Sequence, residues 1–221
     1  MRVCYQTVEF GDVDIHLRTL RDTNELGDDD GAAEALGVPS SMWGIFGVVW
    51  ESSKVLAAMM SVIDIEGSRF LEVGSGIGIA SLMLNHRRAD VTAIDRHPAA
   101  QNFLDQNAAL NHDPAIPFQC VDWGDTVASL GRFDVIIGSD LLYEHDQSDP
   151  LADFIAQHAR PSCRVIFVDP GRGGANRFAR RMQTHGFSHS IERALDSAIT
   201  ASFAAGPRVR VHTFQRDQPA A

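Results

Sequence analysis

The stretch from Arg69 to Ser81 constrains the fold more than any other part of this chain, because it joins a strand, a glycine turn and the start of a helix. It reads Arg-Phe-Leu-Glu-Val-Gly-Ser-Gly-Ile-Gly-Ile-Ala-Ser. The apolar first part suits a buried parallel strand, and a helical pattern begins at Ile79. Glycines allow a sharp turn and let a ligand approach the main chain closely. The stretch therefore predicts a nucleotide-type site built on Gly74, Gly76 and Gly78.

Length, composition and charge narrow the class of protein. With 221 residues, 44% of them hydrophobic, the chain suits one domain of ordinary size with an appendage. It carries 29 acidic and 19 basic side chains, a net charge of -10. That balance argues against a phosphate-binding surface, so we expect no nucleic-acid partner. An acidic surface is more compatible with small molecules or basic protein segments.

Cysteine usage and the absence of targeting signals predict the compartment. Cys4, Cys120 and Cys163 are widely spaced and form no paired motif, which indicates free core thiols in a reducing compartment. No leader pattern and no run of 18 apolar residues occurs, so we expect a cytoplasmic protein without a membrane partner. The nine histidines show no metal-ligand spacing, so no metal site is predicted. We favour a monomer.

The first 41 residues are predicted to lie outside the main fold. Two β-rich stretches, Val3–Thr7 and Val13–Leu20, flank a Gly-Asp turn and predict a hairpin. The stretch 24–41 is acidic and rich in small residues, which favours a loop with at most a short helix. We therefore expect a hairpin and loop appendage over residues 1–41 and the main domain over 42–221.

Strands and helices alternate along the main domain, which predicts an α/β fold with a doubly wound, mostly parallel sheet. The aromatic, glycine-containing stretch 42–53 is expected to lead into a helix, with Ser52 or Ser53 as its cap. Two later β-rich segments are expected to form a closing hairpin. After the strand of the glycine stretch, the expected strands are Ala89–Ile94, Pro117–Val121, Phe133–Gly138, Arg164–Val168, Phe187–Ile191 and Val209–Phe214.

Acidic residues stand at the ends of successive expected strands, where ligands of open parallel sheets bind. Asp95 is placed to accept hydrogen bonds from two ribose hydroxyls. Asp122 is either a turn residue or an acceptor for the exocyclic amine of adenine. Asp140 and Tyr143 follow the next strand and reach the same crevice. Glu72, just before the glycine turn, is expected to face cationic or hydroxyl groups of the ligand.

The glycine spacing argues against a dinucleotide. A Gly-x-Gly-x-x-Gly fingerprint would need glycine at Ile79 or at Ser81, and neither position has it. Glu72 would also repel a pyrophosphate. A ligand with positive charge and no phosphate fits better, and S-adenosylmethionine, with its amino group and sulfonium, is such a ligand.

These motifs resemble the class I, seven-strand methyltransferases that use S-adenosylmethionine. The resemblance covers roughly residues 42–215, with Glu72-Val-Gly-Ser-Gly-Ile-Gly as the first motif. More narrowly, Val49-Trp-Glu-Ser-Ser, Asp122-Trp and Asp140-Leu-Leu-Tyr resemble the branch that holds the seven-strand protein lysine methyltransferases. Asp169-Pro-Gly-Arg is similar to a motif of the enzyme that methylates the electron-transfer flavoprotein β subunit. The segment Glu51-Ser-Ser departs from relatives that often carry Pro or Asp there.

The resemblance implies a seven-stranded Rossmann-like sheet and methyl transfer from S-adenosylmethionine to a protein nitrogen, most simply a lysine, with S-adenosylhomocysteine as product. Two alternatives stay open, a small-molecule acceptor and a catalytically silent module that keeps the nucleoside pocket. Asp140 and Tyr143 are the implied catalytic residues, although a turn cap and a core aromatic are the simpler roles for them. Arg172 would hold a substrate carboxylate or close its own loop. The implied cofactor-binding residues are Trp50, Glu72, Gly74, Ser75, Gly76, Gly78, Asp95, Asp122, Trp123 and Ser139.

Overall fold

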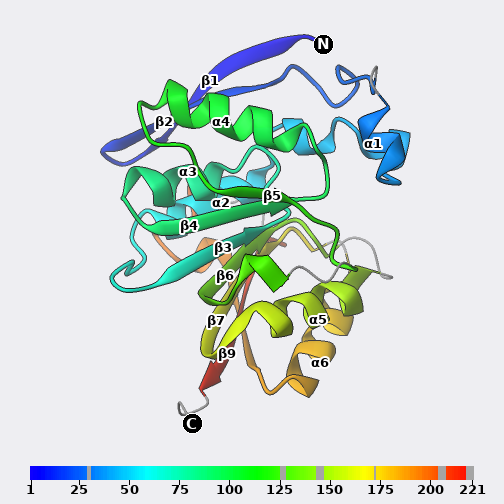
Figure 1. Ribbon diagram of the computed structural model, residues 1–221. Helices are drawn as coiled ribbons and strands as arrows, with labels where there is room; N and C mark the ends of the chain where they lie inside the picture. The colour runs from blue at the N-terminus through cyan, green and yellow to red at the C-terminus, as the bar shows by residue number, and fades with distance from the viewer. Residues whose placement is uncertain (29–30, 125–127, 143–146, 172, 204–207, 218–221) are drawn as a thin grey trace.

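A computed structural model describes residues 1–28, 31–124, 128–142, 147–171, 173–203 and 208–217. Its centre is a seven-stranded sheet with the strand order β5-β4-β3-β6-β7-β9-β8 (Figure 1). The predicted strands are all present, but the one predicted over Arg164–Val168 begins five residues earlier, and the last one ends three residues later than predicted. They are β3 (Arg69–Val73), β4 (Asp90–Asp95), β5 (Phe118–Cys120), β6 (Phe133–Ser139), β7 (Ala159–Asp169), β8 (Ser188–Arg193) and β9 (Arg210–Asp217).

The sheet is doubly wound, as predicted. Strands β3 to β7 pair in parallel, and the chain winds outward from β3 through β4 to β5, then returns to β6 beside β3. The topological switch point thus lies between β3 and β6, where a crevice opens at the carboxyl ends of the strands. The closing hairpin is confirmed as an antiparallel pair, with β9 inserted between β7 and β8.

Helices cover both faces of the sheet (Figure 1). One face packs with α2 (Glu51–Met60), α3 (Ile79–His86) and α4 (Ala100–Leu110), and the other with α5 (Ser148–His158) and α6 (Ala175–Thr184). The predicted serine cap of α2 is wrong. Trp50 occupies the N-cap position, and Ser53 lies inside the first turn, where its hydroxyl donates to the Trp50 carbonyl at 2.6 Å.

The N-terminal hairpin is confirmed, as β1 (Val3–Phe10) and β2 (Val13–Leu20) form a two-stranded sheet of their own. The inward-facing side chains of Ile15, Leu17 and Leu20 are fully buried and join the same apolar cluster as α2 and α3. The hairpin therefore contributes to the core on one side of the main sheet. The following loop holds one short helix, α1 (Ala32–Ala35), as expected.

The three cysteines are free thiols, but only Cys163 is a core residue. Its burial raises the pKa of the thiol to about 12. Cys4 is half-buried and Cys120 is exposed, so the prediction of core positions fails for these two. In the described part of the chain, every helix is too short or too polar to cross a bilayer.

Candidate active site

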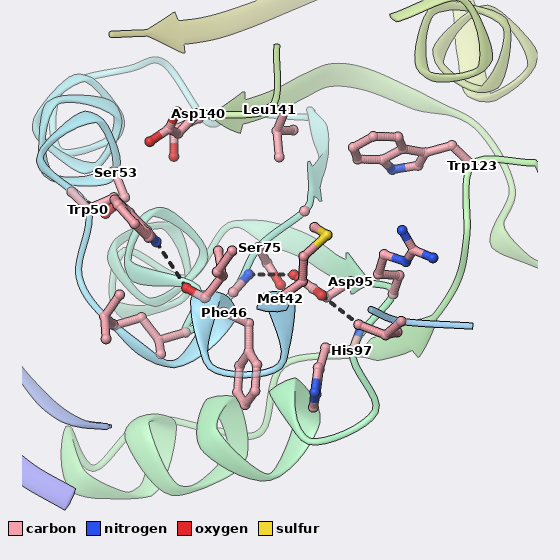
Figure 2. Close-up of a pocket in the computed structure, with 18 of the residues that line it drawn as sticks. Met42, Phe46, Trp50, Ser53, Ser75, Asp95, His97, Trp123, Asp140 and Leu141 are labelled. Carbon is pink, nitrogen blue, oxygen red and sulfur yellow. Dashed lines mark hydrogen bonds between the residues drawn. The ribbon is translucent and has the colours of Figure 1, made fainter. Parts of the chain in front are cut away.

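A cavity of about 280 Å³ lies at the switch point, beyond the carboxyl ends of the central strands (Figure 2). Polar side chains reach it from the ends of four parallel strands. These are Ser75 after β3, Asp95 on β4, Asp122 after β5 and Ser139 on β6. The structure therefore brings together residues that the sequence could only place at separate strand ends.

The glycine loop forms one wall of this cavity. Gly74, Gly76 and Gly78 all have positive φ, of 58°, 56° and 71°, a conformation that L side chains rarely adopt. At Gly76 the main chain lies so close to Phe46 that a Cβ atom would sit 2.9 Å from the Phe46 carbonyl oxygen. Gly78 is the N-cap of α3 and lies outside the cavity lining. Glycine is thus required by both backbone conformation and packing.

Ser75 offers a hydrogen-bonding group to a ligand. Its N–H donates to the Ile94 carbonyl at 2.9 Å, which fixes the loop on β4. Its hydroxyl is buried, lines the cavity and has no hydrogen-bond partner among the described residues. A buried hydroxyl without a partner is costly, so a ligand that bonds to it would be stabilised.

The structure places Glu72 differently from the prediction. Side chains alternate along β3, and Glu72 points to the same face as Phe70, toward α3. Its carboxylate accepts hydrogen bonds from the Ser81 N–H at 2.9 Å and from the Ser81 hydroxyl. It lies outside the cavity lining, and burial raises its pKa to about 7. Glu72 therefore joins the strand to α3 beneath the glycine loop and does not face the ligand space.

Asp95 lines the cavity and also holds the glycine loop. One carboxylate oxygen accepts the Gly76 N–H at 2.8 Å, and the other accepts the His97 N–H at 2.8 Å (Figure 2). Burial raises the pKa of Asp95, and these two hydrogen bonds oppose the increase. Hydrogen bonding to ribose hydroxyls stays a prediction for this side chain.

Asp122 combines features of both roles left open by the sequence. Its Oδ1 accepts the Gly124 N–H at 3.2 Å, as a turn residue would. Its Oδ2 lies 3.3 Å from the Arg96 guanidinium, and both side chains line the cavity together with Trp123. The turn thus places a carboxylate in the cavity lining, and hydrogen bonding to an adenine amine stays a prediction.

Asp140 has an unusual backbone conformation, with φ of 55° at a residue that is not glycine. Such conformations cost free energy and cluster at functional sites. Its N–H donates to the Val168 carbonyl at 2.9 Å, and the residue lines the cavity. In Figure 2 Asp140 lies with Trp50 on one side of the cavity, and Trp123 lies on the other. Tyr143 and Arg172 lie outside the described residues.

A strap, residues 37–50, covers part of the cavity and was not predicted from the sequence, apart from the role of Trp50 as a cofactor-binding residue. Trp43 donates its indole N–H to the Val38 carbonyl at 3.0 Å, and Trp50 donates to the Ile45 carbonyl at 3.0 Å. Trp50 lines the cavity, so it both anchors the segment and faces the ligand space. The only sequence signal was the aromatic content of this stretch.

His97 supports the strap from below. The Phe46 ring stacks on its imidazole with ring centroids 4.3 Å apart (Figure 2). Burial lowers the pKa of His97 to about 4, so the ring is neutral near pH 7. The strap therefore packs on an uncharged imidazole two residues after Asp95.

The donor set of the cavity fits S-adenosylmethionine. Acceptors suited to hydroxyl and amino groups stand at two strand ends, and an unpartnered hydroxyl stands on the loop. Among the described lining residues, Arg96 is the sole Lys or Arg side chain, and it is paired with Asp122. That arrangement suits a nucleoside without phosphates. The predicted cofactor residues that line the cavity are Trp50, Gly74, Ser75, Gly76, Asp95, Asp122, Trp123 and Ser139.

Comparison with known proteins identifies the family. The family model described as lysine methyltransferase matches residues 39–185. This chain belongs to that family. Among curated lysine methyltransferases, it is 31% identical over 108 residues to protein N-lysine methyltransferase METTL21A of Danio rerio, covering 45% of this chain and 49% of the relative. It is 27% identical over 157 residues to EEF1A lysine methyltransferase 3 of Xenopus tropicalis, covering 69% and 65%.

These matches span about half of the METTL21A relatives and slightly less than two thirds of the other relative.

Solved structures of methyltransferases have the same fold as this chain. A putative SAM-dependent methyltransferase from Streptococcus mutans aligns with a TM-score of 0.66 and 10% identity, covering 96% of this chain and 55% of that one. Magnesium protoporphyrin IX methyltransferase from Synechocystis, solved with bound SAM, aligns with a TM-score of 0.57 and 19% identity, covering 75% and 78%. This lysine methyltransferase family member thus shares the class I methyltransferase fold.

Proposed function

We propose that this protein transfers a methyl group from S-adenosylmethionine to the side-chain nitrogen of a lysine in another protein. Membership in the lysine methyltransferase family supports the reaction class. The observation that carries the proposal is the position of Asp140, which lines the same cavity as the glycine loop and stands at the end of β6. A carboxylate there can meet an incoming amine beside the cofactor.

The cofactor, when bound, supplies a methyl carbon activated by a sulfonium. The methionine portion lies against the loop of Gly74, Ser75 and Gly76, and the buried Ser75 hydroxyl forms a hydrogen bond with it. Asp95 accepts from the ribose hydroxyls and Asp122 from the adenine amine. Their existing hydrogen bonds to main-chain N–H groups hold both carboxylates in place before binding.

On the acceptor side, the chain orients an amine and limits water. Methyl transfer forms a bond between nitrogen and carbon as the bond between carbon and sulfur breaks, so the nitrogen must present its lone pair in line. Asp140 accepts a hydrogen bond from that nitrogen. The apolar ring of Trp50, which lies on the same side of the cavity as Asp140, disfavours the charged ammonium (Figure 2). The lysine therefore gives its proton to bulk water before the neutral amine reaches the methyl carbon.

A labelling experiment with cell lysate tests this function. The purified protein is incubated with methyl-labelled cofactor and with lysate from a strain that lacks this protein. The products are then separated into protein and small-molecule fractions. We expect label on a protein, recovered as methylated lysine after hydrolysis. Label in the small-molecule fraction alone would favour the alternative acceptor class, and no label would favour a silent cofactor-binding module.

The chain itself offers a low background for this assay. It contains one lysine, Lys54, among its 19 basic residues, and Glu51 holds that lysine in an ion pair at 2.7 Å. Lys54→Arg therefore removes the last lysine from which self-methylation could arise. Methylated lysine that persists at the protein's own mobility in this variant must come from another protein.

Asp140→Asn tests the catalytic role. Asparagine tolerates the left-handed backbone conformation nearly as well as aspartate, so the substitution removes the charge without forcing the turn. We expect labelling to fall at least about 100-fold, in the range of a lost positioning group, while S-adenosylhomocysteine still binds. Labelling at the wild-type rate would contradict the role of Asp140.

We also propose that the protein works in the cytoplasm. The absence of disulfides among its three cysteines supports this proposal.

A further inference from the structure

Arg96 connects three segments around the nucleoside end of the cavity. It follows Asp95 directly at the end of β4 and lines the cavity. Its Nη2 lies 3.3 Å from Asp122 Oδ2, beyond the end of β5, and 3.4 Å from the Gly37 carbonyl oxygen on the strap. Its own carbonyl accepts the Cys120 thiol at 3.4 Å. One guanidinium thus joins β4, the turn after β5 and the strap.

The carboxylate of Asp122 is held at both oxygens by this arrangement. Oδ1 accepts the Gly124 N–H at 3.2 Å, and Oδ2 pairs with Arg96. The contact with Arg96 adds a restraint on carboxylate rotation at Oδ2, the oxygen that the Gly124 N–H does not hold. Ion pairs of this exposure, with side chains 30% and 40% exposed, contribute little to stability. The contact is therefore better explained by orientation than by stabilisation of the fold.

The Nε atom of Arg96 gives a second observation that points toward a ligand. It is buried and has no hydrogen-bond partner among the described residues. Arg18 and Arg164 also have a buried nitrogen without a partner among the described residues, but of these three arginines only Arg96 lines the cavity. A buried donor on a cavity-lining side chain is expected to find its acceptor on a bound molecule.

We propose that Arg96 is a positioning residue that sets the purine specificity of this site by orienting Asp122. The inference rests on the proposed function, since it assumes that the cavity binds an adenosyl cofactor. A carboxylate accepts a hydrogen bond from the 6-amino group of adenine, but it is repelled by the 6-oxo group of hypoxanthine. Discrimination between these purines requires a carboxylate that cannot rotate away. Arg96 supplies that restraint.

Binding measurements with two product analogues test the proposal. The dissociation constants of S-adenosylhomocysteine and S-inosylhomocysteine are measured by calorimetry for the wild type, Arg96→Ala and Arg96→Lys. We expect the wild type to prefer the adenosyl compound by about 100-fold, as a site does when a wrong base leaves its polar groups unpaired. In Arg96→Ala the adenosyl affinity falls about tenfold and the preference shrinks to less than about tenfold. Lysine keeps the charge without the planar fork and gives an intermediate preference.

Arg160→Ala serves as the matched control. It breaks a comparable ion pair, Arg160 to Asp134 at 3.0 Å, at the opposite ends of the strands. We expect this variant to bind both compounds as the wild type does. If Arg96→Ala weakens the binding of both compounds equally and keeps the preference, Arg96 only lines the cavity and the inference is wrong. A wild type that binds neither compound would overturn the proposed function itself, so the two failures are distinguishable.

Discussion

The side-chain amide of Asn107 on α4 binds the main chain of Arg18 on β2 in the way that a neighbouring strand would. Its Oδ1 accepts the Arg18 N–H at 2.7 Å, and its Nδ2 donates to the Arg18 carbonyl at 3.2 Å. One helical turn later, Asn111 makes the same pair of bonds with His16, at 2.8 and 2.7 Å. The two asparagines therefore satisfy the outer edge of the hairpin, which would otherwise have unpaired main-chain groups.

Asn107→Ala should loosen the hairpin. The substitution leaves a half-buried N–H and carbonyl of Arg18 without these partners, so we expect the free energy of unfolding to fall by about 1–2 kcal/mol. Urea denaturation measures the loss. Asn102→Ala, on the exposed face of the same helix, removes only a side-chain contact with Gln106 and should cost less than about 0.5 kcal/mol. Equal losses in the two variants would contradict the strand-like role of Asn107.

Gly76→Ala should damage the cofactor loop by two separable effects. Gly76 has φ of 56° and a Cβ would lie 2.9 Å from the Phe46 carbonyl oxygen. Gly67→Ala is the matched control, because Gly67 has φ of 64° but open space around it. We expect both variants to lose about 1 kcal/mol of stability from backbone strain. Only Gly76→Ala should also weaken S-adenosylhomocysteine binding by at least about tenfold, measured by calorimetry.

The two strap tryptophans allow a paired test of anchoring against ligand contact. Trp43 and Trp50 each donate an indole N–H to a carbonyl five positions earlier, both at 3.0 Å, but only Trp50 lines the cavity. Phenylalanine at either position removes that hydrogen bond, so each variant should lose about 1 kcal/mol of unfolding free energy. Methyl transfer and cofactor affinity should drop in Trp50→Phe alone. Equal activity loss in both would mean that strap order, and not the Trp50 ring, matters.

Glu72 gives the protein a predictable pH dependence. Its folded-state pKa of about 7 exceeds the ordinary value of 4.5, so the folded state binds more protons between these values than the unfolded state. Stability from this group is therefore present below about pH 4.5 and is lost as the pH rises through 7, by about 3 kcal/mol in total. Glu72→Gln keeps an acceptor for Ser81 and should flatten the unfolding free energy between about pH 5 and pH 8. A variant with the wild-type slope would contradict this assignment, and the exposed control Glu66→Gln should retain that slope.

The sheet was largely predictable because each strand is a short apolar run bounded by turn residues. Phe133–Ser139 is an example, since its burial follows directly from its side chains. The position of β9 between β7 and β8 was not predictable in this way. Local patterns indicate strands, but the order of antiparallel strands at a sheet edge depends on long-range pairing.

The site was predictable in composition but not in geometry. Asp95, Asp122 and Asp140 were predicted to lie together because they follow parallel strands, whose carboxyl ends meet at one edge of the sheet, and all three line the cavity. The direction of Glu72 depended on strand register, which sends it to α3. The strap depended on contacts distant in sequence, such as Gly44 packed directly against the Thr23 carbonyl. No local period reveals such contacts.

The placement of the tryptophans makes the protein its own optical reporter. All three tryptophans of the chain lie on the strap or at the cavity, and two of them, Trp50 and Trp123, line it. A purine that enters the cavity changes the surroundings of both indoles at once. Intrinsic fluorescence should therefore report occupancy of the site directly, and Trp43→Phe should sharpen that signal by removing the one indole that does not face the ligand space.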